Sequence, residues 1–138
     1  MVNKEDNLLA NFNGNLGVSP SSLNEFHLST GLNLPDDYVE FLRRRNGGEG
    51  FIGDSYLILW KLEELVEFNR DYEVTEYCPG LLLIGSSGGG EAYAFDTREA
   101  NWPMVQVPFV GMDPSVIERV GNSFSDFLRA LAKMDDVP

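Results

Sequence analysis

The stretch from Pro79 to Asp96 constrains the fold more than any other part of this chain. Residues 81–84 are all Leu or Ile, a run of strand length between glycines, which predicts a strand buried on both faces. Residues 86–90 are a loop that ends in three consecutive glycines. In residues 92–95 alanine alternates with aromatic residues, so the alanines share one face of a second strand and the aromatics the other. The sequence predicts a central antiparallel hairpin, whose alanine face lets another element approach closely.

Two helices are predicted before this hairpin. The first starts at Ser19-Pro20, an N-cap followed by proline, and Gly31 closes it. The second starts at Pro35 and leaves through Asn46-Gly47. Its first turn carries two aspartates and its last turn three arginines, the placement that the helix dipole favours. Each part of these two helices therefore has a structural explanation.

Two strands and a third helix are predicted between Gly50 and the hairpin. Residues 50–53 and 56–60 have strand composition, and a short polar turn separates them. An amphipathic helix is expected from Lys61 to about Tyr72. Its inward positions are expected to be Leu62, Leu65 and Val66.

The C-terminal third supplies one more strand and a closing helix. Residues 104–107 predict the strand, and residues 109–121 are expected to be irregular, with a short helical turn at 114–118. Asn122 or Ser123 caps the last helix. Its apolar residues fall at i, i+3, i+4 and i+7: Phe124, Phe127, Leu128 and Leu131. The order of elements predicts an α+β fold with a mainly antiparallel sheet of about five strands covered by helices.

Length and composition fit one folded domain. The chain has 138 residues, 43% of them apolar. We expect an N-terminal arm at 1–18, pinned by Leu8, Leu9 and Phe12, a domain at 19–134 and a tail at 135–138. The N-terminus lacks the apolar core of a signal peptide, and no apolar run has membrane-spanning length. A single cysteine fits a reducing compartment, so we expect a cytoplasmic protein.

The net charge constrains the choice of partner. Ten Lys and Arg stand against 22 Asp and Glu, a formal charge of −12. Such a chain should repel nucleic acid and anionic membranes, and its long-range field should attract a basic protein. The alternative is that the excess acid only keeps the protein soluble.

The strongest local group of acidic residues lies on the outer face of the third predicted helix. It comprises Glu63, Glu64, Glu67 and Asp71. A run of this kind is most often a solvated face, but it is also the acidic patch best placed for docking.

Motifs for common catalytic chemistry are missing from the sequence. The glycine loop has neither the GxxxxGK[ST] nor the GxGxxG spacing, and one Cys and one His are too few for a zinc site. Neither His27 nor Cys78 has a sequence context that activates it, so we predict no catalytic, cofactor or metal residues. A carboxylate-dependent hydrolase stays open as a remote alternative. Its candidate residues are Asp36, Asp37, Asp54, Glu91 and Asp96.

The order of these motifs resembles the SUKH superfamily, the domain of the yeast cell-wall assembly regulator and of many bacterial proteins. The matching features are Leu34-Pro35-x-x-Tyr38-x-x-Phe41-Leu42 before Asn46-Gly47-Gly48, the passage from Leu59 to Asn69, the hairpin Ile84-Gly85…Gly90-Glu91…Asp96, and Ser123-Phe124-x-x-Phe127-Leu128. The resemblance covers about residues 19–132. Glu91 is a departure, because the family often carries Asp there.

The resemblance implies a domain without enzymatic activity that binds another protein. Bacterial members resemble immunity proteins that neutralise toxins, many of which act on nucleic acid, and an acidic inhibitor would be steered to a basic toxin. We expect Glu63, Glu64, Glu67 and Asp71 to contact the toxin, with Asp54 and Glu91 as a second edge. The alternative is a general interaction or scaffold domain in cell-wall or signalling regulation. The identity of the toxin and the oligomeric state stay open.

Overall fold

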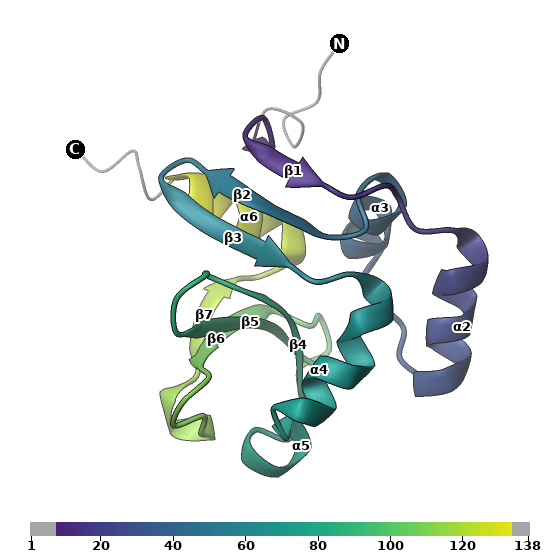
Figure 1. The fold of residues 1–138 in the computed structure, drawn as a ribbon. Helices are drawn as coiled ribbons and strands as arrows, with labels where there is room; N and C mark the ends of the chain where they lie inside the picture. Colours follow the sequence, from purple (N-terminus) through teal and green to yellow (C-terminus); the bar gives the residue numbers. More distant parts are fainter. Residues whose placement is uncertain (1–7, 134–138) are drawn as a thin grey trace.

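Seven strands form one antiparallel sheet, in which each strand pairs with its neighbours in the chain (Figure 1). The computed structural model describes residues 8–133, and the predicted tail at 135–138 lies outside them. The strands are β1 (Phe12–Gly14), β2 (Gly48–Ile52), β3 (Ser55–Leu59), β4 (Leu81–Ser86), β5 (Glu91–Asp96), β6 (Met104–Pro108) and β7 (Glu118–Gly121). The helices are α2 (Pro20–Thr30), α3 (Asp36–Arg44), α4 (Leu65–Asp71), α5 (Val74–Tyr77) and α6 (Phe124–Lys133), with 3₁₀ turns η1 (Leu62–Glu64) and η2 (Pro114–Val116). The predicted α+β class is confirmed.

The central hairpin forms as predicted, with one irregularity in its pairing. β4 and β5 pair antiparallel, and the register shifts between Leu83 and Gly85. A Cβ added at Gly85 would lie 2.0 Å from the carbonyl oxygen of Ile58, so the neighbouring strand β3 can approach only a glycine at this point. Gly88 has φ +83°, and its N–H donates to Ser86 Oγ at 3.2 Å. The glycine loop is therefore a tight turn of the hairpin.

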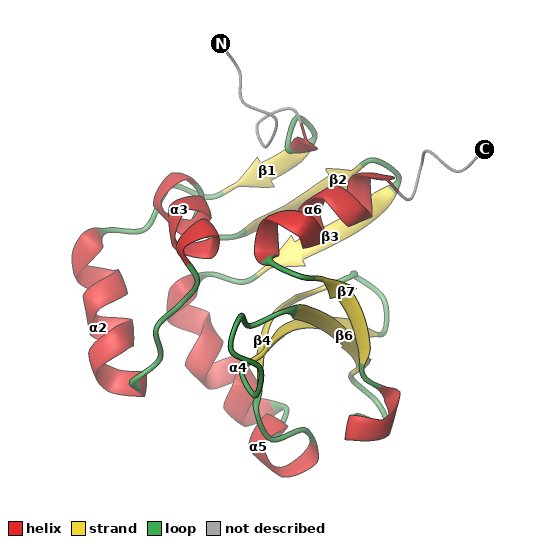
Figure 2. Ribbon diagram, turned by 180° about the vertical axis from the view of Figure 1, so that it is seen from behind, coloured by secondary structure: helices red, strands yellow, loops and turns green. Residues whose placement is uncertain are grey.

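The aromatic face of β5 belongs to the larger core. This side of the sheet packs against α3 and α6, and Figure 2 shows α6 lying across it. The ring of Tyr93 lies 4.7 Å from that of Phe127 on α6, and the ring of Phe95 lies 5.2 Å from that of Tyr38 on α3, measured between centroids. Edge-to-face and tilted contacts of this kind are the favoured aromatic geometries.

The alanine face of β5 belongs to a second, smaller core. Ala92 and Ala94 are completely buried there, together with Val74 and Cys78 of the α5 segment and Met112 of the loop before η2. Because alanine has only a Cβ, these covering segments can approach the sheet closely. The predicted division of β5 into a volume-filling face and a close-approach face is therefore confirmed.

The predicted helix ends are also found. Ser19 Oγ accepts a hydrogen bond from the N–H of Ser22 at 3.2 Å, and Gly31 ends α2 with φ +71°. In α6, Ser123 Oγ accepts from the N–H of Asp126 at 3.1 Å. A contact that the sequence did not predict joins the helices: Asp37 Oδ2 of α3 accepts from the N–H of Ser125 at 2.9 Å, which ties the start of α6 to α3.

The sheet has seven strands rather than about five. The additional strands are β1, inside the predicted N-terminal arm, and β7, inside the segment predicted to be irregular. They pair with β2 and β6 at the two edges of the sheet and have only three and four residues. Strands this short show no alternation in the sequence, and tertiary pairing alone defines them. Leu8, Leu9 and Phe12 contact the larger core, as expected.

The helix predicted from Lys61 to about Tyr72 is confirmed in its extent, but its first turn is a 3₁₀ helix and one of its inward positions is wrong. η1 leads directly into α4, which ends at Asp71, and α5 follows after Glu73, which has a left-handed backbone with φ +53°. Leu62 and Leu65 are buried as predicted, but Val66 is 48% exposed. One residue further along α4 is a rotation of about 100°, so Val66 faces away from the sheet while Leu65 faces it.

Candidate functional site

The segment from Lys61 to Tyr77, which forms η1, α4 and α5, is a region of uncompensated negative charge. It contains six Asp and Glu residues against one Lys and one Arg. Among the described residues, no ion pair involves this segment. Ion pairs lie elsewhere, such as Arg43–Glu40, Arg98–Asp96, Arg119–Glu99 and Arg129–Asp126.

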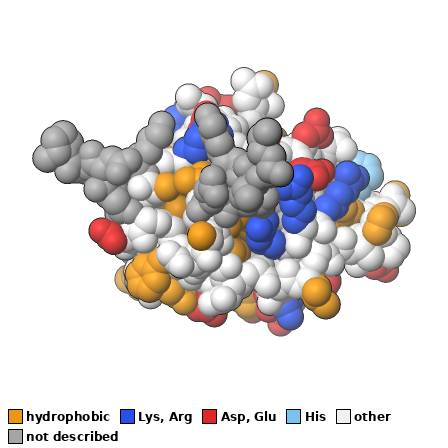
Figure 3. Space-filling view, turned by 90° about the horizontal axis from the view of Figure 1, so that it is seen from above, with side chains coloured by type: hydrophobic (Ala, Val, Ile, Leu, Met, Phe, Trp, Pro, Cys, Tyr) orange, Lys and Arg blue, Asp and Glu red, His pale blue; other side chains and the backbone are white. Residues whose placement is uncertain are grey.

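Lys and Arg side chains gather on a different face of the molecule. Figure 3 views the molecule from the side of β1 and α3 in Figure 1 and shows this group. The last turn of α3 contributes two of three consecutive arginines, and Arg45 follows as its C-cap. Figure 1 places α4 and α5 at the opposite end of the molecule. The three arginines at the end of α3 thus lie apart from the acidic segment.

Two of the predicted contact residues also stabilise the local fold. Glu63 Oε1 accepts a hydrogen bond from Asn46 Nδ2 at 2.8 Å, and Asn46 Oδ1 accepts from the N–H of Leu62 at 2.8 Å. Glu64 Oε1 accepts from the N–H of Lys61 at 2.9 Å, which caps η1. Glu63 is exposed and Glu64 is half-buried. Their carboxylates are therefore held in place by the chain itself.

The other two predicted contact residues of this helix, Glu67 and Asp71, are exposed on α4. They are four residues apart and so project from the same outer side of the helix. Neither side chain makes a hydrogen bond or an ion pair within the described part of the chain. These carboxylates are free to meet a cationic partner.

Asp54 and Glu91 lie apart from the η1–α4 residues. Asp54 is exposed in the turn between β2 and β3, at the far end of β3 from η1. Glu91 is half-buried at the start of β5, next to the glycine loop. Gly88 of that loop packs near Tyr56 of β3, so both residues belong to the hairpin end of the sheet. The six predicted residues thus occupy two regions of the surface.

A groove runs along the other side of α4, between this helix and α2. Its main section has a volume of about 640 Å³, and a second section of about 250 Å³ also has Phe26 and Val66 in its lining. Figures 1 and 2 both show α2 beside α4. The apolar lining of the main section consists of Phe26, Leu32, Val66, Val74, Leu81 and Leu82. No signal for this groove is present in the sequence, because its lining comes from segments that are distant in the chain.

An aromatic cluster covers the opposite flank of α4. The ring of Trp60 lies 4.8 Å from that of Phe68, and the ring of Tyr72 lies 4.6 Å from that of Phe109, measured between centroids. Tyr72 is 41% exposed. The i, i+4 spacing of Phe68 and Tyr72 could have indicated this second stripe, which was missed. Trp and Tyr at a surface are typical of binding hot spots.

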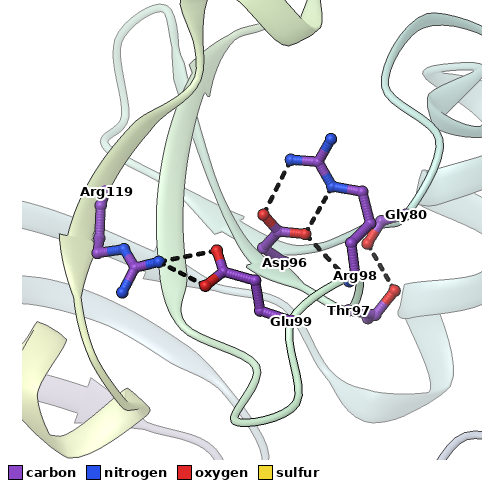
Figure 4. Close-up of polar contacts among 6 residues, drawn as sticks. All are labelled: Gly80, Asp96, Thr97, Arg98, Glu99 and Arg119. Atoms are coloured by element: carbon purple, nitrogen blue, oxygen red, sulfur yellow. Dashed lines mark hydrogen bonds and ion pairs between the residues drawn. The ribbon is translucent and has the colours of Figure 1, made fainter.

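Asp96, at the end of β5 away from the glycine loop, stabilises the fold. Figure 4 shows its carboxylate bonded to the guanidinium of Arg98. Nε and Nη2 of this arginine donate to Oδ1 and Oδ2 of Asp96 at 2.9 Å each. These hydrogen bonds lower the pKa of Asp96 below its ordinary value, although burial acts in the opposite direction. Beside it, Thr97 Oγ1 donates to the carbonyl oxygen of Gly80 at 2.6 Å.

The other candidate carboxylates for hydrolysis do not meet Asp96. Glu91 is at the opposite end of β5, and the five residue steps between the two correspond to roughly 17 Å. Asp37 is bonded to the N-terminus of α6 through the N–H of Ser125. Asp36 is exposed at the start of α3. Asp96 and Asp37 are thus each engaged by another part of the fold, and Glu91 lies far from Asp96.

The remaining reactive side chains are placed as follows. Cys78 is buried, and burial raises the pKa of its thiol. His27 is exposed, and its Nδ1 lies 3.0 Å from the carbonyl oxygen of Leu32. Among residues 8–133, no three His, Cys, Asp or Glu side chains are grouped so that they could hold a metal ion. In the same range, the longest and most apolar helices fall short of what crossing a bilayer requires.

The fold and the order of its elements define an α+β domain with one antiparallel sheet covered by helices. The chain belongs to the SMI1/KNR4 family (SUKH-1), whose family model matches residues 17–130. The resemblance drawn from the sequence motifs is thereby confirmed.

A curated relative is the "Uncharacterized protein YnaB" of Bacillus subtilis (strain 168). It is 35% identical over 83 residues, which make up 60% of this chain and 53% of YnaB. The chain thus spans about half the length of the curated relative that it matches. This match assigns no activity.

Proposed function

We propose that this protein is a cytoplasmic immunity protein, without catalytic activity of its own, that binds and neutralises a basic toxin domain. The observation that carries the proposal is the exposed, unpaired charge of Glu67 and Asp71 on a segment with six acidic residues and two basic ones. Toxins that act on nucleic acid are commonly basic, because they must approach phosphate. An acidic surface would be steered to such a domain and would compete with its substrate.

The geometry adds a physical reason for a tight complex. Charge alone gives fast association but modest affinity, whereas aromatic and apolar contacts supply most of the binding energy of an interface. The α4 segment has both, because Tyr72 and the Trp60 ring flank the carboxylates on one side. Glu63 and Glu64, which the chain holds in place, extend this surface, and Asp54 with Glu91 provides a second edge.

The first step of the test is to look for a toxin gene next to the gene of this protein, which the proposal predicts. Binding to the encoded toxin domain is then measured by titration calorimetry at several salt concentrations. The double reversal Glu67→Lys/Asp71→Lys should weaken the complex by about 100-fold at low salt and flatten its salt dependence. The matched control is Glu49→Lys/Glu118→Lys, which changes the net charge equally on two strands, β2 and β7. The control should retain most of the affinity and should still protect the toxin's substrate.

Two results would contradict this proposal. If both double variants bind as the unchanged protein does, the α4 carboxylates are not the contact surface. If pull-down from native cells captures a cell-wall or signalling protein, and no toxin domain binds, the scaffold function replaces immunity.

A further inference from the structure

The groove between α2 and the α4–α5 segment has an apolar floor and an acidic rim. Its floor includes Val66 and Val74 of the helices and Leu82 of β4. Glu73 and Glu76 line the same section, and neither makes a side-chain hydrogen bond or ion pair in the described structure. Arg70 is the one basic residue among the lining residues, so the rim as a whole is negative. A volume of about 640 Å³ is within the range of sites that bind a ligand or a few side chains.

The backbone at this rim is strained. Glu73 has φ +53° and ψ +44°, a left-handed conformation that glycine or asparagine adopts more easily than glutamate. Its carbonyl oxygen accepts from the N–H groups of Glu76 and Tyr77, at 3.0 and 3.1 Å, so the conformation starts α5. A glycine would make the same turn at lower cost. Strain of this kind that is retained next to a groove points to a use for the side chain.

Charge decides among the possible occupants of the groove. A second copy of this chain would bring another protein of charge −12 against an acidic rim, which is electrostatically unfavourable. A segment with apolar side chains between Lys or Arg residues would fill the floor and pair with the rim. The groove is continuous with α4, whose outer side carries Glu67 and Asp71.

We infer that this groove receives a basic segment of the partner, with apolar side chains against Val66 and Leu82 and Lys or Arg side chains against Glu73 and Glu76. This inference rests on the proposed function, since it names a second contact of the same basic partner. It adds the partner's apolar side chains, which a purely electrostatic interface would not select.

The first experiment uses a defined probe on the full chain. A synthetic peptide of about 16 residues, in which Leu recurs on one helical face and Lys fills the other, is compared with a scrambled peptide of the same composition. Amide and methyl NMR shifts should change at residues that line the groove, and the ordered peptide should bind about tenfold more tightly than the scrambled one. Equal affinity for both peptides, or shift changes confined to other surfaces, would overturn the inference.

Variants then separate the apolar and charged contributions. Val66→Lys should weaken binding of the peptide and of the toxin domain about tenfold or more. Leu16→Lys is the matched control, because Leu16 is 92% exposed and lies outside the groove lining. If Val66→Lys binds the toxin domain as tightly as the unchanged protein does, the groove inference fails while the immunity function stands.

Two variants of Glu73 separate a role of its carboxylate in binding from a role of its backbone in the turn before α5. Glu73→Gly should raise the melting temperature by about 3 °C, because it relieves the strain, and should still weaken peptide binding. Glu73→Gln keeps the strain and loses the charge, so it should weaken binding with little change in melting temperature. If both variants bind the peptide normally, the carboxylate has no role at the groove. Self-association that Val66→Lys abolishes would instead identify a second copy as the occupant.

Discussion

At the scale of single residues, the charged side chains of this protein divide into those that the fold uses and those that it leaves free. Asp96 is 5% exposed and is held by the guanidinium of Arg98, whose two nitrogens bond to both carboxylate oxygens. Glu67 and Asp71 have no such partner among the described residues. The same residue type therefore stabilises the domain at one position and is available to a partner at another.

The bond between Asp96 and Arg98 should make stability depend on pH in acid. The pKa of Asp96 lies below its ordinary value of 3.8 because Arg98 donates to its ionised form. A lowered folded-state pKa means that the stabilisation is complete above about pH 4 and is lost as the pH falls through the folded value. Asp96→Asn should therefore cost about 2 kcal/mol of unfolding free energy near neutral pH, and less in acid. Urea unfolding at a series of pH values measures this.

The control for this prediction is Glu99→Gln, which removes a carboxylate from the exposed pair with Arg119. An ion pair in which both side chains are about half exposed contributes little, so the cost should stay under about 1 kcal/mol. A loss for Asp96→Asn that is equally large at pH 3 and pH 7 would contradict the assigned cause.

At the scale of secondary-structure elements, β5 determines how closely the two sides of the domain can approach the sheet. Its aromatic residues fill the space below α3 and α6, while its alanines allow the α5 segment and the loop before η2 to pack against the other face. Asn69 of α4 fixes the distance on that side, since its amide bonds to both the N–H and the carbonyl oxygen of Leu83 at 2.8 and 2.9 Å.

Enlarging the alanine face should therefore destabilise the domain. Ala94 is completely buried and pairs with Leu83 on one side and Val105 on the other. Ala94→Leu adds volume at a completely buried position of the second core, so the unfolding free energy should fall by about 2 kcal/mol. Ala130→Leu, at an exposed position of α6, is the control and should change it by less than about 0.5 kcal/mol. Equal stability of the two variants in urea would show that the second core is loosely packed.

At the scale of the whole molecule, the net charge of −12 is opposed to folding but favours association with a basic partner. In the described structure, the segment from Lys61 to Tyr77 carries six acidic residues and makes no ion pair. Repulsion between like charges in the folded state is therefore expected to be strongest there. Binding of a basic protein would relieve the same repulsion. Stability and binding should thus respond in opposite ways to changes in this segment.

Salt should therefore stabilise the free protein and weaken its complex. Raising NaCl from about 0.05 to about 0.5 M screens the repulsion and should raise the melting temperature by about 2–4 °C. In low salt, Glu67→Lys/Asp71→Lys should produce a rise of similar size, and added salt should then have less effect. Differential scanning calorimetry measures both. A melting temperature that falls with salt, or is equally salt-sensitive in the variant, would show that these carboxylates do not repel one another in the folded state.

Local sequence patterns determined the elements whose boundaries depend on nearby residues. Alternation in residues 92–95 placed the two faces of β5, Ser19 and Gly31 marked the ends of α2, and the spacing of Phe124 and Phe127 defined α6. These signals arise from backbone preferences and from apolar burial, which act over a few residues and so can be read along the chain.

Only the tertiary structure decided the edges of the sheet and the groove. β1 and β7 are strands because β2 and β6 supply their hydrogen bonds, and the groove forms where residues of α2 and α4 line a common hollow. Likewise, the identity of Asp37 does not reveal that its carboxylate accepts a hydrogen bond from the N–H of Ser125 at the start of α6. Contacts between residues distant in the chain depend on how the elements pack, and a local pattern holds no information about that packing.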